Sequence, residues 1–378
     1  MNNRFIRVFK LFNRYLKKKR KYKFFVLQVE PTTRCQLKCR ICPRSDQAVR
    51  WVEEDMPLAL YKKLSDYFSV TKHVHLQGWG EPLLHKDIIE MVNIAKRAGS
   101  IVSLTTNGLL LDNNMIAELL KSNIDILAFS LGGSSDHTHS LVRGGKLSDM
   151  LNNISSLITA KKRNNLKYPQ IKFSYMMTKD NISELPEVLT LMKKFNIKEL
   201  VATNIDYTPT SVQDELKLFD CNKVNTIYQG YLDKAKVFSI KLGITLKIFP
   251  IKMSEQPMCE ASPIDTIFIT VNGDVSPCVY LNLPVTGNIK RIFCDKYEEI
   301  KKLSFGNIDS DKLSDIWESE AYKEFRDSFN NRINASERIL PIEMTLADLD
   351  EYNKKYENML KQYPLPNVCK SCYKAYGV

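Results

Sequence analysis

The sequence predicts an α/β protein in which a partial (βα)6 TIM-like barrel is followed by a small α+β domain. From residue 24 to about residue 250, short apolar runs alternate with longer segments of helical periodicity, a pattern typical of repeated βα units around a parallel sheet. Near residue 255 this rhythm stops, and two β-type runs follow around Asn272-Gly273, a strong hairpin signal. A chain of 378 residues can hold one large barrel with an attachment. We therefore divide it into a basic arm (1–23), a barrel (24–254) and a second domain (255–378).

Each expected element follows from a local pattern. The barrel strands are short apolar runs, and the expected ones are 24–32, 73–82 with its turn, 100–108, 124–133, 170–178, 198–206 and 243–250. The helices show apolar residues at helical spacing and are expected at 57–68, 85–99, 112–122, 148–164 and 182–195. Gly99 is a stop signal and Asp112 is a plausible N-cap. The second domain should hold a hairpin within 265–281, a helix at 312–329 and a weakly patterned charged stretch at 331–362.

Composition and charge limit the function classes. With 44% hydrophobic and 26% charged residues, the chain has the composition of a soluble globular protein, and no run of eighteen apolar residues is present. The N-terminus has neither a continuous apolar core nor a small-residue cleavage site, so we predict a cytoplasmic protein. The net charge of +12 is local: residues 1–23 carry ten positive and no acidic side chains, and the remainder carries about +2.

The basic arm also carries an apolar stripe at helical spacing, formed by Phe5, Val8, Phe9, Phe12, Tyr15 and Leu16. Three interpretations stay open. The arm can be a solvated helix packed on the main domain, a helix lying on an anionic membrane surface, which would make the protein peripheral, or a contact for nucleic acid or an acidic partner.

Three cysteines follow the first expected strand: Cys35, Cys39 and Cys42. A structural zinc site normally takes four protein ligands and a disulfide framework an even number of cysteines. Three thiolates instead suit a 4Fe-4S cluster with one iron left open. The alternatives are zinc completed by a distant residue such as His73 or His75, or unrelated free thiols.

The Cys35-x3-Cys39-x2-Cys42 spacing after a first strand resembles the signature of radical S-adenosylmethionine (radical SAM) enzymes. The resemblance implies that these cysteines hold a 4Fe-4S cluster and that S-adenosylmethionine binds the open iron through its amino and carboxylate groups. In this family the reduced cluster cleaves the cofactor to a 5'-deoxyadenosyl radical, which removes a hydrogen atom from the substrate.

Further motifs resemble the same family in the expected order. "GWGEP" (Gly78, Trp79, Gly80 and Glu81, then proline) is similar to the motif that meets the methionyl amino group, although Trp79 stands where a small residue is usual. "TTNG" suggests Thr106 and Asn107 as cofactor neighbours. The stretch after the fourth strand suggests Ser130 for the ribose and Arg143 for the carboxylate, which a guanidinium fork suits. Relatives often have aspartate at Gly132, so any role of that carboxylate is absent or moved.

A second cysteine set resembles the C-terminal SPASM domain of radical enzymes, and more closely its shortened, single-cluster twitch form. The resemblance implies one auxiliary 4Fe-4S cluster held by Cys259, Cys278, Cys369 and Cys372; structural zinc is the alternative. The roughly ninety residues between Cys278 and Cys369 are more than we expect of the compact form. For Cys221 and Cys294 we favour plain thiols; a hydrogen-atom donor, or for Cys294 a replacement ligand, is the alternative.

Together these features predict a radical SAM oxidoreductase whose auxiliary cluster accepts an electron, as in dehydrogenation of a sugar-like or aminocyclitol-like small molecule. The alternatives are a maturase that epimerises or cross-links a ribosomal peptide and, from another class, a zinc-dependent nucleic-acid-binding module. The first two need a small-molecule or peptide substrate and a reducing partner such as flavodoxin or ferredoxin, with no specific nucleic acid. The catalytic residue is not predicted; Asp206, Tyr207 and Asp265 are candidates for a general base by their place near strand ends.

Overall fold

The computed structural model describes residues 22–339 and 349–378. All nine cysteines lie within these ranges. Residues 1–21, which hold most of the basic arm, lie outside them, so the three interpretations of the arm stay predictions. Within the described ranges, no helix combines the length and the apolar character needed to cross a membrane.

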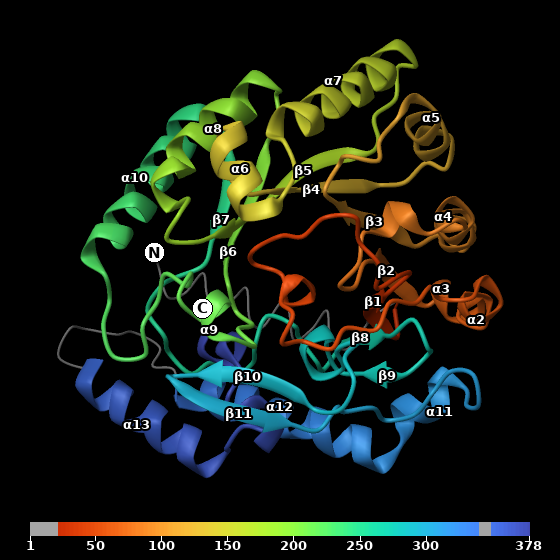
Figure 1. Ribbon diagram of the computed structural model, residues 1–378. Helices are drawn as coiled ribbons and strands as arrows, with labels where there is room; N and C mark the ends of the chain where they lie inside the picture. Colours follow the sequence, from red (N-terminus) through yellow and green to blue (C-terminus); the bar gives the residue numbers. More distant parts are fainter. Residues whose placement is uncertain (1–21, 340–348) are drawn as a thin grey trace.

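One large sheet organises the protein (Figure 1). It has nine strands in the order β7-β6-β5-β4-β3-β2-β1-β8-β9, and every neighbouring pair is parallel except β8 and β9. The barrel strands are β1 (Phe24–Val29), β2 (Thr71–Leu76), β3 (Ile101–Thr106), β4 (Ile126–Leu131), β5 (Gln170–Met177), β6 (Glu199–Asn204) and β7 (Thr245–Ile248). The sequential strand order confirms the expected barrel of βα units.

Helices cover the outer face of this curved sheet (Figure 1). They are α2 (Leu58–Lys62), α3 (Ser65–Phe68), α4 (Ile88–Arg97), α5 (Asn113–Lys121), α7 (Leu147–Arg163), α8 (Leu185–Lys194) and α10 (Thr226–Leu242). Two further helices, α6 (Asp136–Arg143) after β4 and α9 (Ser211–Asp214) after β6, lie at the mouth of the barrel instead. Asp112 caps α5 as expected, since its side chain accepts a hydrogen bond from the Met115 N–H. The expected helix 57–68 is wrong as one element: it breaks into α2 and α3, where the Ser65 hydroxyl donates to the Lys62 carbonyl (2.7 Å).

The strands bury alternate residues against the helices. In β4, for example, Leu127, Phe129 and Leu131 are fully buried in the main core, whereas Ala128 and Ser130 are only partly buried. Because side chains alternate across a strand, Ala128 and Ser130 face the inside of the barrel. On β4 the inner face therefore carries one small and one polar side chain.

The sheet continues beyond the expected barrel. β8 (Thr266–Ile269) pairs in parallel with β1, and it forms the predicted hairpin with β9 (Val275–Ser276) around Asn272-Gly273. A second hairpin, β10 (Ile289–Phe293) with β11 (Lys296–Ile300), was not expected. The domain boundary near residue 255 stays a prediction.

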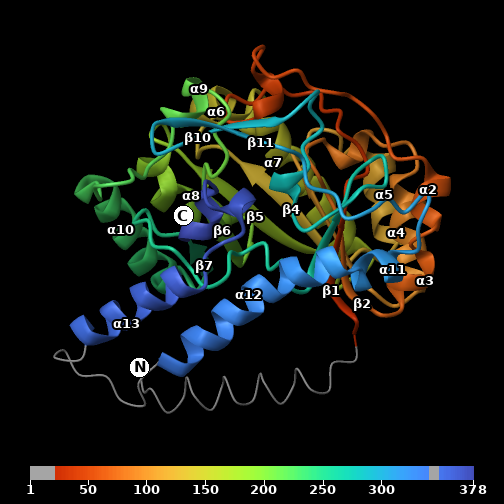
Figure 2. The same ribbon diagram turned by 90° about the horizontal axis from the view of Figure 1, so that it is seen from below.

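Outside residues 340–348, the C-terminal part holds the α-helices α11 (Leu313–Glu318), α12 (Glu320–Ile339) and α13 (Leu349–Gln362). Figure 2 shows α12 and α13 lying side by side below the barrel. The single helix expected at 312–329 is wrong, because the chain turns at Ser319 between α11 and α12. The stretch 331–362, expected to be weakly patterned, is helical at 331–339 and 349–362.

Candidate active site

The three-cysteine loop begins where β1 ends, at the mouth of the barrel. Cys35, Cys39 and Cys42 are free and partly exposed. The Cys42 N–H donates to the Cys39 carbonyl (3.0 Å), which folds the last two cysteines into a turn. The Cys39 thiol donates to the backbone carbonyl of Arg143 (3.0 Å), so the loop touches the end of α6. The loop therefore presents three thiols over the carboxyl ends of the strands, where barrel enzymes place their chemistry.

The "GWGEP" loop follows β2 and lies against this cysteine loop. A Cβ atom added at Gly78 would lie 2.2 Å from the Glu30 side chain, and one added at Gly80 would lie 2.3 Å from the Thr32 carbonyl oxygen. Both positions therefore exclude any side chain. The Glu81 N–H donates to the Arg34 carbonyl (2.8 Å), which ties the two loops together.

Glu81 connects two of the predicted cofactor neighbours. Its buried carboxylate accepts hydrogen bonds from the Thr106 hydroxyl (2.7 Å) and the Asn107 N–H (2.8 Å) at the end of β3. The Asn107 side-chain nitrogen in turn lies 4.0 Å from the Cys35 sulfur. The structure thus brings Glu81, Thr106 and Asn107 together beside the cysteine loop.

The remaining two predicted cofactor residues lie on β4 and α6. Ser130 faces the barrel interior beside Ser174 of β5. The Arg143 Nε and Nη2 atoms lie 3.4 Å from the Leu131 carbonyl oxygen, near the strand end. A Cβ atom at Gly132 would lie 2.7 Å from the Arg143 side chain, so the glycine leaves room for the arginine. This close approach gives a physical reason for glycine at this position.

The second cysteine set also comes together. Cys259 precedes β8, Cys278 follows β9, and Cys369 and Cys372 lie near the chain end. Burial first, and then the neighbouring Cys372, raise the pKa of the Cys259 thiol to about 12. Burial and then the charges of Cys259 and Cys372 raise the pKa of Cys278 as well. These four partly buried thiols, distant in sequence, therefore lie close enough to act on one another electrostatically.

Both thiol sets fit an iron-sulfur centre. Burial, with Cys39 adding to its effect, raises the pKa of the Cys42 thiol to about 12, and a bound metal cation would lower it again by compensating the thiolate charge. Within residues 22–339 and 349–378, no three His, Cys, Asp or Glu side chains lie so that they could bind a single metal ion. A cubane places each thiolate on a separate iron, so its ligands need not converge on one point. His73 and His75 instead bond Ser103 inside the barrel (2.7 and 2.6 Å).

The prediction of plain thiols at Cys221 and Cys294 is wrong. These residues, 73 positions apart, form a disulfide with a Cα–Cα distance of 5.6 Å. Cys294 lies in the turn of the β10–β11 hairpin, which places it over the segment that precedes α10. The disulfide therefore fastens this hairpin to the barrel.

We expect this disulfide to be detected directly. In protein isolated anaerobically without reductant, then unfolded and treated with iodoacetamide, Cys221 and Cys294 should stay unlabelled and their peptides should be joined. After treatment with a reductant both should be labelled. Full labelling of both cysteines before reduction, measured by mass spectrometry of the digested protein, would contradict the pairing.

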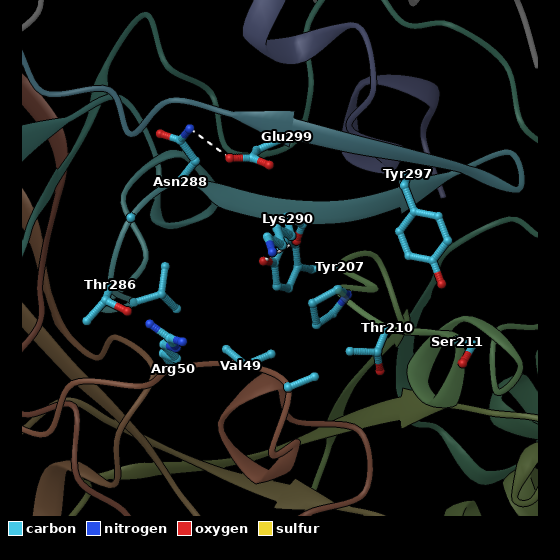
Figure 3. Close-up of a pocket in the computed structure, with 14 residues that line it drawn as sticks. Val49, Arg50, Tyr207, Thr210, Ser211, Thr286, Asn288, Lys290, Tyr297 and Glu299 are labelled. Carbon is cyan, nitrogen blue, oxygen red and sulfur yellow. Dashed lines mark hydrogen bonds between the residues drawn. The ribbon is translucent and has the colours of Figure 1, made fainter.

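A cleft of about 890 Å³ opens at the barrel mouth (Figure 3). Its walls are the end of the cysteine loop at Arg50, the segment after β6 at Tyr207, and the β10–β11 hairpin at Lys290, Tyr297 and Glu299. The Tyr207 hydroxyl donates to the Lys290 carbonyl (2.8 Å), so the segment after β6 is joined to the β10–β11 hairpin. The cleft offers cationic, anionic and aromatic groups to a ligand.

Aromatic side chains connect this cleft with the "GWGEP" loop. The ring of Trp79 lies 5.7 Å from Tyr207, 6.0 Å from Trp51 and 6.0 Å from Tyr280, all edge to face. Its indole N–H donates to the Val279 carbonyl (3.3 Å). Through these contacts Trp79 attaches the "GWGEP" loop to the segment that follows Cys278.

The three general-base candidates are not equivalent. Asp206 and Tyr207 lie at the mouth, directly after β6. Asp265 precedes β8 and accepts backbone hydrogen bonds from Phe25 and Val26 at the start of β1. Asp265 therefore lies at the opposite end of the barrel, and its selection as a candidate was wrong.

Glu30, for which no role was predicted from the sequence, lies beneath the "GWGEP" loop. Its side chain is fully buried, and one carboxylate oxygen accepts a hydrogen bond from the Trp79 N–H (2.8 Å). The other oxygen has no hydrogen-bond partner among residues 22–339 and 349–378. Burial raises the pKa of Glu30 to about 8. The only available sequence signal was an acidic residue at the end of the first apolar strand.

The raised pKa of Glu30 predicts a pH-dependent contribution to stability. Between pH about 4.5 and pH about 8 the folded protein keeps a proton that the unfolded chain releases, so this contribution falls as the pH rises. Glu30→Gln removes this titration, and its melting temperature relative to the unaltered protein should rise from pH about 5 to pH about 8.5. A difference that stays constant over this range, measured by anaerobic thermal unfolding, would contradict the burial argument.

Family models match two parts of the chain. The radical SAM superfamily model matches residues 29–213, and the model of an iron-sulfur cluster-binding domain (SPASM) matches residues 259–338. The first match contains Cys35, Cys39 and Cys42, and the second contains Cys259 and Cys278.

Individual proteins show the same similarity. The chain is 26% identical to a tungsten-containing aldehyde ferredoxin oxidoreductase cofactor-modifying protein of Pyrococcus furiosus, over 79% of this chain and 82% of that protein. It is 26% identical to the PqqA peptide cyclase of Bradyrhizobium diazoefficiens, over 47% of this chain and 46% of that protein.

Solved structures share the fold. Streptococcus suis SuiB bound to S-adenosylmethionine matches with a TM-score of 0.60 at 17% identity, covering 83% of this chain and 70% of SuiB. The structure titled native anSMEcpe with bound AdoMet and Cp18Cys peptide matches with a TM-score of 0.58 at 15% identity, covering 89% of this chain and 97% of that one. The chain belongs to the radical SAM superfamily and carries a C-terminal SPASM domain, so its cofactors are S-adenosylmethionine and 4Fe-4S clusters.

Proposed function

We propose that this protein is a radical SAM oxidoreductase that acts on a substrate held in the cleft at the barrel mouth. The observation that carries the proposal is the placement of two separate thiol sets at this mouth, one in the loop after β1 and one around the β8–β9 hairpin. In this proposal Cys35, Cys39 and Cys42 hold the first cluster. Cys259, Cys278, Cys369 and Cys372 hold the auxiliary cluster.

When bound, S-adenosylmethionine and the first cluster would supply the radical chemistry that removes one hydrogen atom from the substrate. A cluster on Cys259, Cys278, Cys369 and Cys372 would take the second electron, and solvent would take the proton. The protein supplies position and exclusion of water. The backbone of Gly78 and Gly80 can approach the methionyl group closely, because no side chain stands there. Glu81 keeps this loop against Thr106 and Asn107, and Arg143 offers a guanidinium near the cysteine loop for a carboxylate.

The proposed substrate is a small polar molecule of the carbohydrate or aminocyclitol kind. The cleft volume of about 890 Å³ lies in the usual range of small-molecule sites. Arg50, Lys290 and Glu299 on its walls can bind hydroxyl, amino or acidic groups. A reducing partner such as flavodoxin or ferredoxin completes the proposal.

A peptide substrate is the second candidate. Strand β11 has an exposed outer edge beside the cleft, and Tyr297 is 74% exposed. An extended peptide could add to such an edge by backbone hydrogen bonds. One of the structures that share the fold is Streptococcus suis SuiB bound to its precursor peptide SuiA, which supports this candidate.

The decisive experiment is anaerobic reconstitution followed by iron and sulfide counting and by assay of 5'-deoxyadenosine under reducing conditions. We expect about eight irons per chain and nucleoside formation. Deuterated polyols or aminocyclitols, compared with peptides encoded near the gene, should show which class transfers deuterium to 5'-deoxyadenosine. Zinc-containing colourless protein without nucleoside product would support the binding-module alternative and refute the proposal.

A further inference from the structure

Asp206 joins the barrel mouth to the auxiliary thiols. It follows β6 directly and is only 8% exposed. Its Oδ2 atom accepts a hydrogen bond from the Tyr280 hydroxyl (3.1 Å) and lies 2.6 Å from the Lys374 ammonium. Lys374 is also 8% exposed, so both charges of this pair are buried.

Both partners belong to the auxiliary site. Tyr280 follows Cys278 by two residues, and Lys374 follows Cys372 by two residues. One carboxylate therefore fixes the two chain segments that bring these cysteines together. Fixing both segments from one point determines how the thiols sit relative to the barrel.

The same carboxylate is linked to the cofactor loop and the cleft. Tyr280, which it holds, packs edge to face on Trp79 at 6.0 Å. Tyr207, its neighbour in sequence, packs on Trp79 at 5.7 Å and lines the cleft. Asp206 thus lies where the cleft, the "GWGEP" loop and the auxiliary thiols meet.

Buried charges act strongly on a nearby redox centre, because little solvent screens them. A cation beside an iron-sulfur cluster favours the more reduced, more negative form, and an anion disfavours it. The Lys374 ammonium and the Asp206 carboxylate would therefore shift the cluster potential in opposite directions, and together they would largely cancel.

We propose that Asp206 is a positioning residue that holds the auxiliary site against the barrel mouth and, by neutralising Lys374, sets the reduction potential of the auxiliary cluster. This inference rests on the proposed function, because it assumes a cluster on Cys259, Cys278, Cys369 and Cys372. It adds a role for a charge pair outside both ligand sets.

The test is a redox titration of the auxiliary cluster, followed by electron paramagnetic resonance, in the full-length reconstituted protein. Asp206→Asn leaves the ammonium uncompensated, so the potential should rise. Lys374→Met leaves the carboxylate uncompensated, so the potential should fall. The double variant removes both charges, and its potential should return toward that of the unaltered protein. Tyr280→Phe keeps both charges and should shift the potential less than either charge variant.

Asp125→Asn is the matched control. Asp125 also pairs with a lysine at 2.6 Å, Lys96, but it precedes β4 and so lies at the far end of the barrel. It should leave the auxiliary potential unchanged.

The inference would be overturned if Asp206→Asn and Lys374→Met shifted the potential in the same direction, or if their potentials equalled that of Asp125→Asn. It would also be overturned if the two single charge variants, the double variant and Tyr280→Phe all lost the auxiliary iron. A protein that binds only about four irons before any substitution refutes the proposed auxiliary cluster itself. Failure of the inference is thereby distinguished from failure of the proposed function.

Discussion

Cys39→Ala is expected to abolish 5'-deoxyadenosine formation and to lower the iron content from about eight to about four per chain. A cubane held by three thiolates loses a third of its protein ligands in this variant, and the Cys42 thiol loses the metal charge that favours its ionisation. The auxiliary thiols are unchanged, so their four irons should remain. The measurements are anaerobic iron and sulfide analysis and chromatography of the nucleoside product.

The control for this variant is Cys221→Ser combined with Cys294→Ser. These two cysteines pair with each other and belong to neither proposed ligand set. The double variant should keep about eight irons and nucleoside formation. Unchanged iron in Cys39→Ala, or loss of iron in the control, would show that the ligands are assigned wrongly.

Arg332→Met is expected to lower the free energy of unfolding by about 3–5 kcal/mol. The Arg332 side chain of α12 is fully buried, and its guanidinium lies 2.7 Å from the Glu255 carboxylate. It also donates to the carbonyls of Gln256 (2.9 Å), Pro257 (3.1 Å) and Tyr363. The variant leaves these acceptors unpaired in a buried place, where each lost partner is costly. Anaerobic denaturant unfolding measures the change.

Lys323→Met on the same helix is the matched control. Its side chain is half exposed and pairs with Glu318 at 3.3 Å, so the loss should be at most about 1 kcal/mol. If the two substitutions lowered the free energy of unfolding equally, this would contradict the proposal that Arg332 holds α12 against the segment before Cys259.

The barrel could be predicted because its determinants are local. Parallel strands that helices cover appear in the sequence as short, mainly apolar runs. The runs 101–106 and 126–131 are of this kind, and glycine or polar residues stand on either side of each. The cysteine loop could be placed for the same reason, since Cys35, Cys39 and Cys42 follow β1 directly. The hairpin at Asn272-Gly273 was equally visible.

The features that sequence reasoning missed depend on contacts between distant segments. The parallel pairing of β8 with β1 joins residues about 240 positions apart, and no local pattern specifies such a partner. The Cys221–Cys294 disulfide depends on the β10–β11 hairpin, which no sequence pattern predicted. No local pattern marks Glu30 as important, because its role depends on burial beneath a loop that lies some fifty residues later in the chain.

Strand alternation also set a limit. It identifies which residues of β4 face the core, but it does not show that Ser130 lies beside Ser174 until the β4–β5 register is known. The same holds for Asp206, which was selected only because it follows a strand. Its partners Tyr280 and Lys374 could not be inferred from the sequence.

The most direct test of the account is electron paramagnetic resonance of the reduced first cluster with and without S-adenosylmethionine, in a Cys369→Ala/Cys372→Ala variant that should lack the auxiliary cluster. If Cys35, Cys39 and Cys42 leave one iron open, adding the cofactor should change the spectrum, because the cofactor binds that iron. An identical spectrum with and without the cofactor, or a cluster shown to have four protein ligands, would contradict the account.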